Sequence, residues 1–152
     1  MAESLPLYIV LVTGIPEIFL SLLLGFRLFN DTFNPKYALL ISIIASCVNY
    51  IVRHWGVIFG IHTMFTTATI IIMCFALTQK NIWKITSATV TGIVLLLFIE
   101  VIEVLVGRFL NLNIAPLTGK LLMAFFKIVF MSAALVIVRK KNFSLFNSAF
   151  FE

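Results

Sequence analysis

The stretch LLLFIEVIEVLVGRF, from Leu95 to Phe109, decides the fold class of this chain. It consists almost entirely of Leu, Ile, Val and Phe, yet Glu100 and Glu103 stand three residues apart within it. The whole chain is equally apolar, with 62% hydrophobic and 11% charged residues among its 152. Soluble domains carry about 25% charged residues. The composition therefore predicts an all-α, polytopic integral membrane helical bundle that contacts the lipid bilayer.

Five apolar runs approach the length of about 20 residues that a helix needs to cross the hydrocarbon core. We expect about five transmembrane helices. Polar breaks containing Asn, Pro, Lys or Gly separate most of them, as in NDTFNPK (Asn30 to Lys36) and TQKN (Thr78 to Asn81). The first run has no basic residue before it, so we interpret it as a retained span and not as a cleaved signal peptide. The expected spans are Leu5–Phe29, Tyr37–Val52, Ile61–Leu77, Ile82–Val106 and Thr118–Val138.

The break RHWGVIFG, from Arg53 to Gly60, is the least polar of the interruptions. It leaves open an alternative with four spans, in which the second and third runs form a helical hairpin that does not cross. We divide the chain into a transmembrane bundle over residues 1–138 and a basic, aromatic cytoplasmic tail over residues 139–152. The tail is expected either to lie as a short helix on the anionic leaflet or to have no fixed structure.

Lysine and arginine residues are unevenly distributed between the two ends of a five-span bundle. Positive residues favour the cytoplasmic side, so we expect a cell-membrane protein with its N-terminus outside and its C-terminus in the cytoplasm. The net charge of +5 then reflects orientation and anionic lipid, and no nucleic-acid partner is expected. One end has seven basic residues (Arg27, Lys36, Lys80, Lys84, Arg139, Lys140, Lys141), and the other has three (Arg53, Arg108, Lys120).

Two ionisable residues lie near the middle of the membrane. Glu17 is roughly 18 Å from the outer end of the first span, and Lys127 is roughly 13 Å from the same side. An unpaired charge at that depth costs roughly 3 kcal/mol, so we predict that Glu17 and Lys127 face the interior and form a pair. Pro16 precedes Glu17, and we expect it to kink or unwind the first helix there. The pair is either a structural ion pair or part of a polar binding site.

A second charged group is expected at the outer end of the bundle. Glu100 and Glu103 share one helix face, within two turns of the end of their span. Several basic residues flank the same end, which would form an outward-facing vestibule: Arg53, His54, His62, Arg108 and Lys120. This group is interpreted as a salt-bridge ring, as a site for a small charged or zwitterionic ligand, or as a divalent metal site. No strong metal motif is present, so no metal or other cofactor is assigned.

Small residues recur at four-residue spacing in several spans, which favours close packing of helices in lipid. Ala88 and Gly92 do so in the fourth run. The second run has Ala38, Ser42 and Ser46, and the third has Thr63 and Thr67. Cys47 and Cys74 lie in apolar runs and are interpreted as reduced packing residues.

The motifs TGIPE, from Thr13 to Glu17, and RHWGVIFGIHT, from Arg53 to Thr63, give the chain a family resemblance. It resembles the N-terminal membrane-sensor regions of Firmicute sensor histidine kinases of the GHKL and Spo0B-type group, which are similar to the peptide receptor of the accessory gene regulator system. The resemblance implies detection of an extracellular or membrane-borne signal and its transmission through the last helix. The chain has no phosphoacceptor helix and no ATP-binding domain, so it would act as a free-standing or separated sensor module.

Three functions are compatible with these features. The first is a sensor-like or regulatory module that binds a small charged ligand or a cytoplasmic or membrane protein partner. The second is a small transporter or a substrate-binding transporter subunit that uses the charges at mid-membrane. The third is a structural membrane subunit, and a second copy of the chain is a further candidate partner. No enzyme activity is expected, because nucleophile, phosphate-loop and dinucleotide motifs are absent from the sequence.

Overall fold

The computed structural model describes residues 7–55, 61–109 and 117–141, and these residues form five α-helices. Each helix is long and apolar enough to cross a membrane. This confirms the expected all-α class and indicates a multi-pass membrane protein. The helices are α1 (Leu7–Leu28), α2 (Pro35–His54), α3 (Ile61–Thr78), α4 (Ile82–Phe109) and α5 (Leu117–Lys141).

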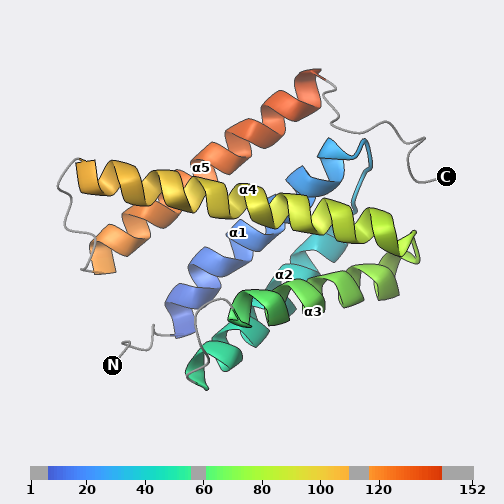
Figure 1. Cartoon of the computed structure of the whole chain (residues 1–152), viewed down its shortest axis with the longest axis horizontal. Coiled ribbons are helices and arrows are strands. Elements are labelled where there is room, and N and C mark those ends of the chain that lie inside the picture. The colour runs from blue at the N-terminus through green and yellow to red at the C-terminus, as the bar shows by residue number, and fades with distance from the viewer. Residues whose placement is uncertain (1–6, 56–60, 110–116, 142–152) are drawn as a thin grey trace.

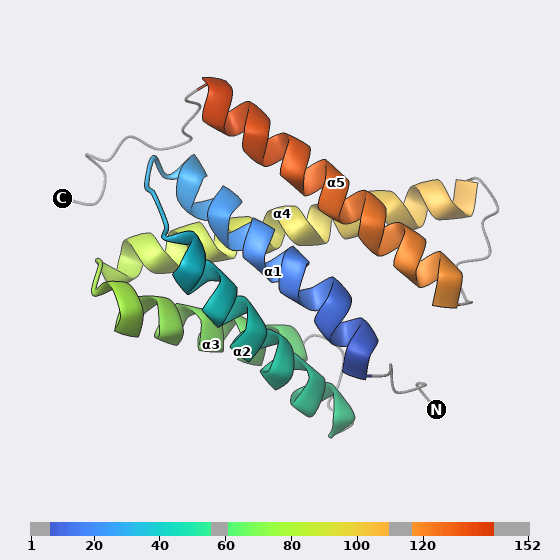
Figure 2. The ribbon, with the colours of Figure 1, turned by 180° about the vertical axis from the view of Figure 1, so that it is seen from behind.

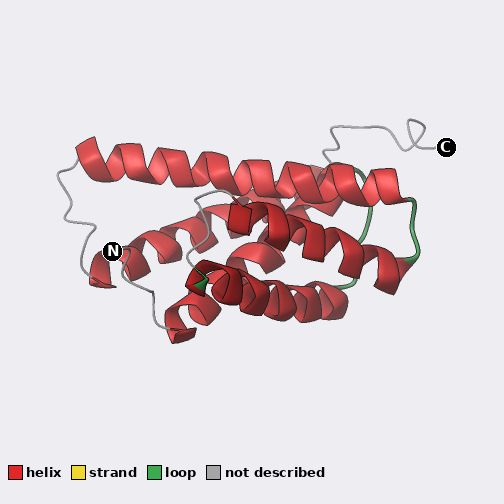
Figure 3. Ribbon diagram, turned by 60° about the horizontal axis from the view of Figure 1, so that its bottom comes forward, coloured by secondary structure: helices red, strands yellow, loops and turns green. Residues whose placement is uncertain are grey.

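The described helices pack in two layers (Figure 1, Figure 2). One layer contains α2, α1 and α5, with α1 in the middle and in contact with both neighbours. The other layer contains α3 and α4, and α4 crosses over α1 and also reaches α5. Figure 3 shows α4 along one side of the bundle, where it extends well past the beginning of α3. The helix α1 is thus covered on three sides.

Helix α1 is the core of the bundle because its second half is apolar on nearly every face. Between Ile18 and Leu28 nearly every side chain is buried, and Phe26 has no exposed surface. A helix that is apolar on all faces is stable only when other helices or lipid cover it. Here α2, α4 and α5 provide that cover. The other described helices each keep an exposed apolar face, which suits contact with lipid acyl chains.

The tightest helix contact is the crossing of α1 and α4. A Cβ added to Gly25 would lie 2.2 Å from the backbone oxygen of Ala88, and a Cβ added to Gly92 would lie 2.3 Å from that of Ser21. No real side chain tolerates such distances, so both positions require glycine. Ala88 and Gly92 therefore pack as their spacing predicted, and Gly25 is the partner on α1 that was not predicted. In lipid the hydrophobic effect does not drive helices together, so their association depends on the close van der Waals packing that small residues permit.

The other small-residue faces have mixed outcomes. Ala38, Ser42 and Ser46 of α2 are fully buried, as expected. On α3 the buried polar residues are His62 and Thr66, so the prediction that Thr63 and Thr67 form the packing face is wrong by one helical position. The side chains of Thr63 and Thr67 remain half-buried, and the Thr67 hydroxyl donates to the carbonyl of Thr63 at 2.7 Å.

We expected Pro16 to kink or unwind the first helix before Glu17. Helix α1 continues without interruption through Pro16, so the unwinding is wrong and the kink stays a prediction. Proline removes the hydrogen bond to the carbonyl four residues earlier, which costs several kcal/mol in an exposed helix, about 3 by peptide measurements. In a bundle, the neighbouring helices limit the alternatives, and one missing backbone bond is tolerated. A mid-membrane break in α1 therefore no longer supports a binding site.

Two polar turns end and restart the helices by the same chemistry. Asn30 after α1 and Gln79 after α3 adopt the left-handed conformation, with φ of 53° and 49°. The side-chain oxygens of Asn34 and Asn81 then accept hydrogen bonds from the backbone of the next helix, each at 3.0 Å. These are N-cap contacts, and they confirm the two turns predicted from NDTFNPK and TQKN.

Helix α5 runs three residues past the expected end of its span. Arg139, Lys140 and Lys141 form its last turn, where positive charge is favourable next to the exposed carbonyl groups. The remainder of the expected tail, residues 142–152, lies outside the described residues, so its short amphipathic helix stays a prediction. Residues 56–60 and 110–116 of the expected outer loops also lie outside the described part.

We predict that Gly25→Ala and Gly92→Ala each lower the thermal stability of the detergent-solubilised protein. A new Cβ would force α1 and α4 apart, and overpacking of this kind costs about 1–3 kcal/mol. Alanine otherwise favours a helix over glycine by about 1 kcal/mol. A decrease in melting temperature would therefore be caused by the steric clash where α1 and α4 cross. Gly14→Ala is the control, because its Cβ would meet only the side chain of Ser46, at 3.2 Å. An equal melting temperature in all three variants would contradict the prediction.

Candidate functional site

Lys127 of α5 joins three helices through two ion pairs. Its Nζ lies 3.0 Å from Oε1 of Glu17 on α1 and 2.9 Å from Oε1 of Glu100 on α4. The predicted pair of Glu17 and Lys127 is therefore confirmed. The second partner, Glu100, was not predicted for this lysine. One ammonium group thus holds two carboxylates inside the membrane-spanning region.

The position of Glu100 differs from the expected one, and the length of α4 explains the difference. The fourth span was expected to end near Val106, which placed Glu100 in an outer vestibule. The helix continues to Phe109, so Glu100 lies roughly 14 Å from its end, about as deep as Lys127 lies in α5. The expected outer group and the expected mid-membrane pair are consequently one cluster, centred on Lys127.

Glu103 lies one turn beyond Glu100 on the same helix. It is close enough for its charge to interact with those of Lys127, Glu17 and Glu100. Its Oε1 atom is buried and has no hydrogen-bond partner among the described residues. A buried polar atom without a partner is costly and calls for an explanation. Glu103 is therefore the least satisfied carboxylate of the cluster.

Arg53 and His62 bring α2 and α3 to the same cluster. Nη2 of Arg53 lies 3.3 Å from Nε2 of His62, which acts as the acceptor because a guanidinium group only donates. The segments 62–78 and 82–98 are equally long on either side of the turn between α3 and α4, so His62 is level with the residues just before Glu100. The charge of Glu100 accordingly interacts with His62, and that of Arg53 with Glu17.

Of the other basic residues expected near this group, only His54 has a described side chain, and its ring contact lies elsewhere. His54 is exposed at the end of α2 and stacks on Tyr50, with ring centroids 6.0 Å apart. The side chains of Arg108 and Lys120 lie outside the described part of the chain. We name the six residues that do interact the charged cluster: Glu17, Arg53, His62, Glu100, Glu103 and Lys127.

Among the described side chains, the charged cluster contains three carboxyl groups, one ammonium group, one guanidinium group and one imidazole, and Arg53 is exposed near the end of α2. Exposure within the ion pairs is uneven: the side chain of Glu100 is 43% exposed, against 14% for Glu17 and 9% for Lys127. The cluster is thus accessible from the Glu100 side while its lysine is enclosed. Among the described residues no group of three or more His, Cys, Asp or Glu is arranged to hold a metal ion.

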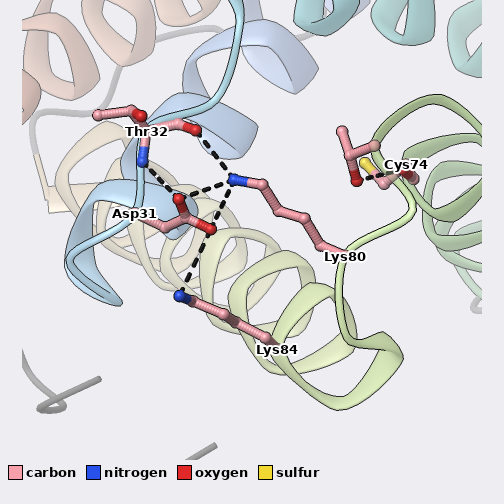
Figure 4. Close-up of polar contacts among 6 residues, drawn as sticks. Asp31, Thr32, Cys74, Lys80 and Lys84 are labelled. Carbon is pink, nitrogen blue, oxygen red and sulfur yellow. Dashed lines mark hydrogen bonds and ion pairs between the residues drawn. The ribbon is translucent and has the colours of Figure 1, made fainter. Parts of the chain in front are cut away.

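A second ion-pair group lies at the opposite end of the bundle, between two turns (Figure 4). The Asp31 carboxylate lies 2.7 Å from the ammonium of Lys80 and 3.6 Å from that of Lys84. Lys80 also donates to the carbonyl of Thr32 at 3.2 Å. The group joins the turn after α1 to the turn before α4. Sequence reasoning assigned these lysines only to orientation; the lone acidic residue in a basic region was the available signal.

No protein-family model, curated protein or solved structure matches this chain.

We predict that Lys127→Met destabilises the protein more than Glu17→Gln does. Removing the lysine leaves two carboxylates without their cation, whereas removing Glu17 leaves Lys127 paired with Glu100. Breaking a buried pair from one side costs about 3–5 kcal/mol, and replacing all partners by neutral groups costs much less. The triple variant Lys127→Met, Glu17→Gln, Glu100→Gln should therefore recover stability relative to Lys127→Met. Thermal unfolding in mild detergent measures the order of stability of these variants. If the triple variant lost as much stability as the three single variants together, the ion-pair assignment would be contradicted.

Proposed function

We propose that this protein is a sensor-like or regulatory membrane module that binds a small charged ligand at the charged cluster. The observation that carries the proposal is the partial exposure of Glu100, which leaves a charged group at depth reachable from outside the bundle. Ionisable residues within membrane spans are costly and mark functional sites more often than they mark structural ones. A purely structural ion pair does not require an exposed carboxylate, and the side chains of Glu17 and Lys127 are only 14% and 9% exposed.

The route from the cluster to the far end of the molecule runs along α5. Lys127 contacts α1 and α4, and the same helix ends in Arg139, Lys140 and Lys141. A change in the ion pairs would therefore act on a helix whose last turn faces the opposite membrane surface. We propose that this surface is the cytoplasmic one, in agreement with the basic residues gathered there and with the resemblance to sensor regions of histidine kinases. A cytoplasmic or membrane protein partner would bind the basic end of α5.

Transport is the second candidate, and the ion pairs at mid-membrane favour it. Charged side chains near the bilayer centre recur at transport sites, often beside interrupted helices. The continuous course of α1 through Pro16 removes one of the two features that supported this alternative. We therefore place ligand sensing first.

Small molecules retained by the purified protein test the proposal. The protein is extracted in mild detergent from membranes of the organism that encodes it, and bound metabolites are identified by mass spectrometry. We expect a metabolite that co-purifies with the wild type, that is lost in Glu100→Gln, and that is kept in Asp31→Asn. Asp31 is the matched control because it is an ion-paired carboxylate at the other end of the bundle. No metabolite above the level of an unrelated membrane protein would favour a structural subunit.

The proposed orientation has its own test at the two ends of α2. Thr32 lies just before the first residue of α2 and Trp55 just after its last residue, and both are exposed. In a background with Cys47→Ala and Cys74→Ala, we expect Trp55→Cys to react with an impermeant maleimide in intact cells. Thr32→Cys should react only after permeabilisation. Reaction of both positions from the same side would mean that α2 does not cross the membrane, and reversed labelling would invert the orientation.

A further inference from the structure

The end of the bundle that contains Asp31 has a large surplus of positive charge. The end of α1, the beginning of α2, the turn between α3 and α4 and the last turn of α5 all lie there (Figure 1, Figure 2). We call it the basic end of the bundle. The described residues of these segments include one acidic residue, Asp31, and seven basic residues: Arg27, Lys36, Lys80, Lys84, Arg139, Lys140 and Lys141.

Residues outside the described part cannot remove this surplus, because the sequence contains too few acidic residues. Of its six, three belong to the charged cluster. Glu3 precedes α1 by four residues, which span at most about 14 Å, and α1 itself is roughly 33 Å long, so Glu3 cannot reach the basic end. Glu152 is the one acidic residue of the segment 142–152. The seven basic side chains therefore face at most two acidic ones, Asp31 and Glu152.

Two lysines share the Asp31 carboxylate at this end (Figure 4). The ammonium of Lys80 lies 2.7 Å from Oδ1 and 2.8 Å from Oδ2, whereas that of Lys84 lies 3.6 Å from Oδ2. A separation of 3.6 Å is too long for a hydrogen bond. One carboxylate compensates only one of the two lysine charges, and the side chain of Lys84 is partly exposed. Lys84 is therefore the lysine of this group that can accept a second anion.

Aromatic residues next to these lysines indicate that the basic end lies at the level of lipid headgroups. Trp83 precedes Lys84, Tyr37 follows Lys36, and both aromatic side chains are exposed. Trp and Tyr gather at the membrane–water interface, because their rings combine an apolar body with a polar group. On the same face of α4 as Trp83, exposed apolar side chains continue along the helix away from this end: Val90, Val94 and Leu97. Positive charge, aromatic ring and apolar face thus follow one another in the order of the phosphate, the interface and the acyl chain of a phospholipid.

We propose that Lys84 binds the phosphate of an anionic phospholipid whose acyl chain lies along the face of α4 that begins at Trp83. Lys80 adds a second positive charge beside that phosphate. An acidic protein that approaches from water would match the charges, but it would leave the apolar face unused. The lipid site lies at the other end of the molecule from the charged cluster, so it goes beyond the proposed function and does not depend on it.

The two tryptophans of the chain are matched reporters, because Trp83 and Trp55 are 71% and 74% exposed and lie at opposite ends. Trp55→Phe leaves Trp83 as the reporter, and Trp83→Phe leaves Trp55. Each protein is reconstituted in vesicles of phosphatidylcholine and phosphatidylglycerol with identical chains, and one of the two lipids is brominated so that it quenches a neighbouring tryptophan. We expect quenching of Trp83 to show a preference of about fivefold for phosphatidylglycerol, the ratio that one lysine near an anionic surface supplies. Equal quenching by the two lipids would overturn the proposal.

Charge variants of the Trp83 reporter locate the site. Lys84→Gln should remove most of the preference, and its folding should be preserved because Asp31 keeps its contact with Lys80. Lys140→Gln removes the same charge from the end of α5 and should leave most of the preference. Equal losses in these two variants would overturn the site, because they would show a diffuse attraction to the whole basic end. With Trp55 as the reporter, Lys84→Gln should leave the quenching by phosphatidylglycerol unchanged, and a loss there would contradict the location.

Two further variants test the same charge if Lys84→Gln does not fold. Lys84→Arg keeps the positive charge and should keep the preference. Asp31→Asn should increase the preference, because the phosphate then no longer competes with a carboxylate for Lys84. A preference lost in Lys84→Arg or lowered in Asp31→Asn would contradict the proposal. If Trp83 shows no lipid preference and an acidic protein binds the wild type but not Lys84→Gln, the basic end is a protein-binding surface and the proposal is wrong.

Discussion

The shared ammonium group of Lys127 is the interaction on which the interior of this bundle depends. It lies within 3.0 Å of carboxylates on two other helices, and it is almost completely enclosed. Burial keeps water away from Glu17 and Lys127, so their charges are stable only while α1 and α5 hold this geometry. The ion pairs therefore fix the rotation of three helices about their own axes. Apolar packing alone would specify that rotation only weakly.

The ion pairs depend in turn on how closely α1 and α4 approach. Glycines at positions 25 and 92 let the two backbones touch, about two turns from the level of the cluster. Larger side chains at this crossing would separate α1 from α4. Glu100 would then move away from Lys127, which pairs with both Glu100 and Glu17. Close packing and charge pairing are thus coupled, because the first sets the distance that the second requires.

Charge distribution also distinguishes the two ends of the molecule. At one end Asp31, in the turn after α1, pairs with Lys80 in the turn before α4 and with Lys84 on α4, and both lysine side chains are partly exposed. Such pairs contribute little stability because water screens them. The charged cluster is different, since the same kinds of groups lie at depth, where each charge without a partner is expensive.

Much of the fold was predictable from the sequence because a bilayer imposes simple rules. Runs of about 20 apolar residues must be helices, and the Asn, Pro and Lys breaks must be turns, so the helix boundaries were expected within a few residues. The pairing of Glu17 with Lys127 followed from the cost of isolated charges at similar depth. The sequence left open whether α1 would be kinked or unwound at Pro16. Proline removes one backbone hydrogen bond, and the sequence does not show how far the neighbouring helices offset that loss.

What the sequence by itself determined is therefore the set of spans, their turns and the need of each buried charge for a partner. Only the tertiary structure decided which partner each charge has. Glu100 meets Lys127 because α4 extends to Phe109 and crosses α1 at two glycines, and Gly25 has no sequence signal without knowledge of that crossing. Helical periodicity specifies the face of a residue on its own helix, whereas contacts between helices depend on tilt and register. Those are properties of the packed bundle.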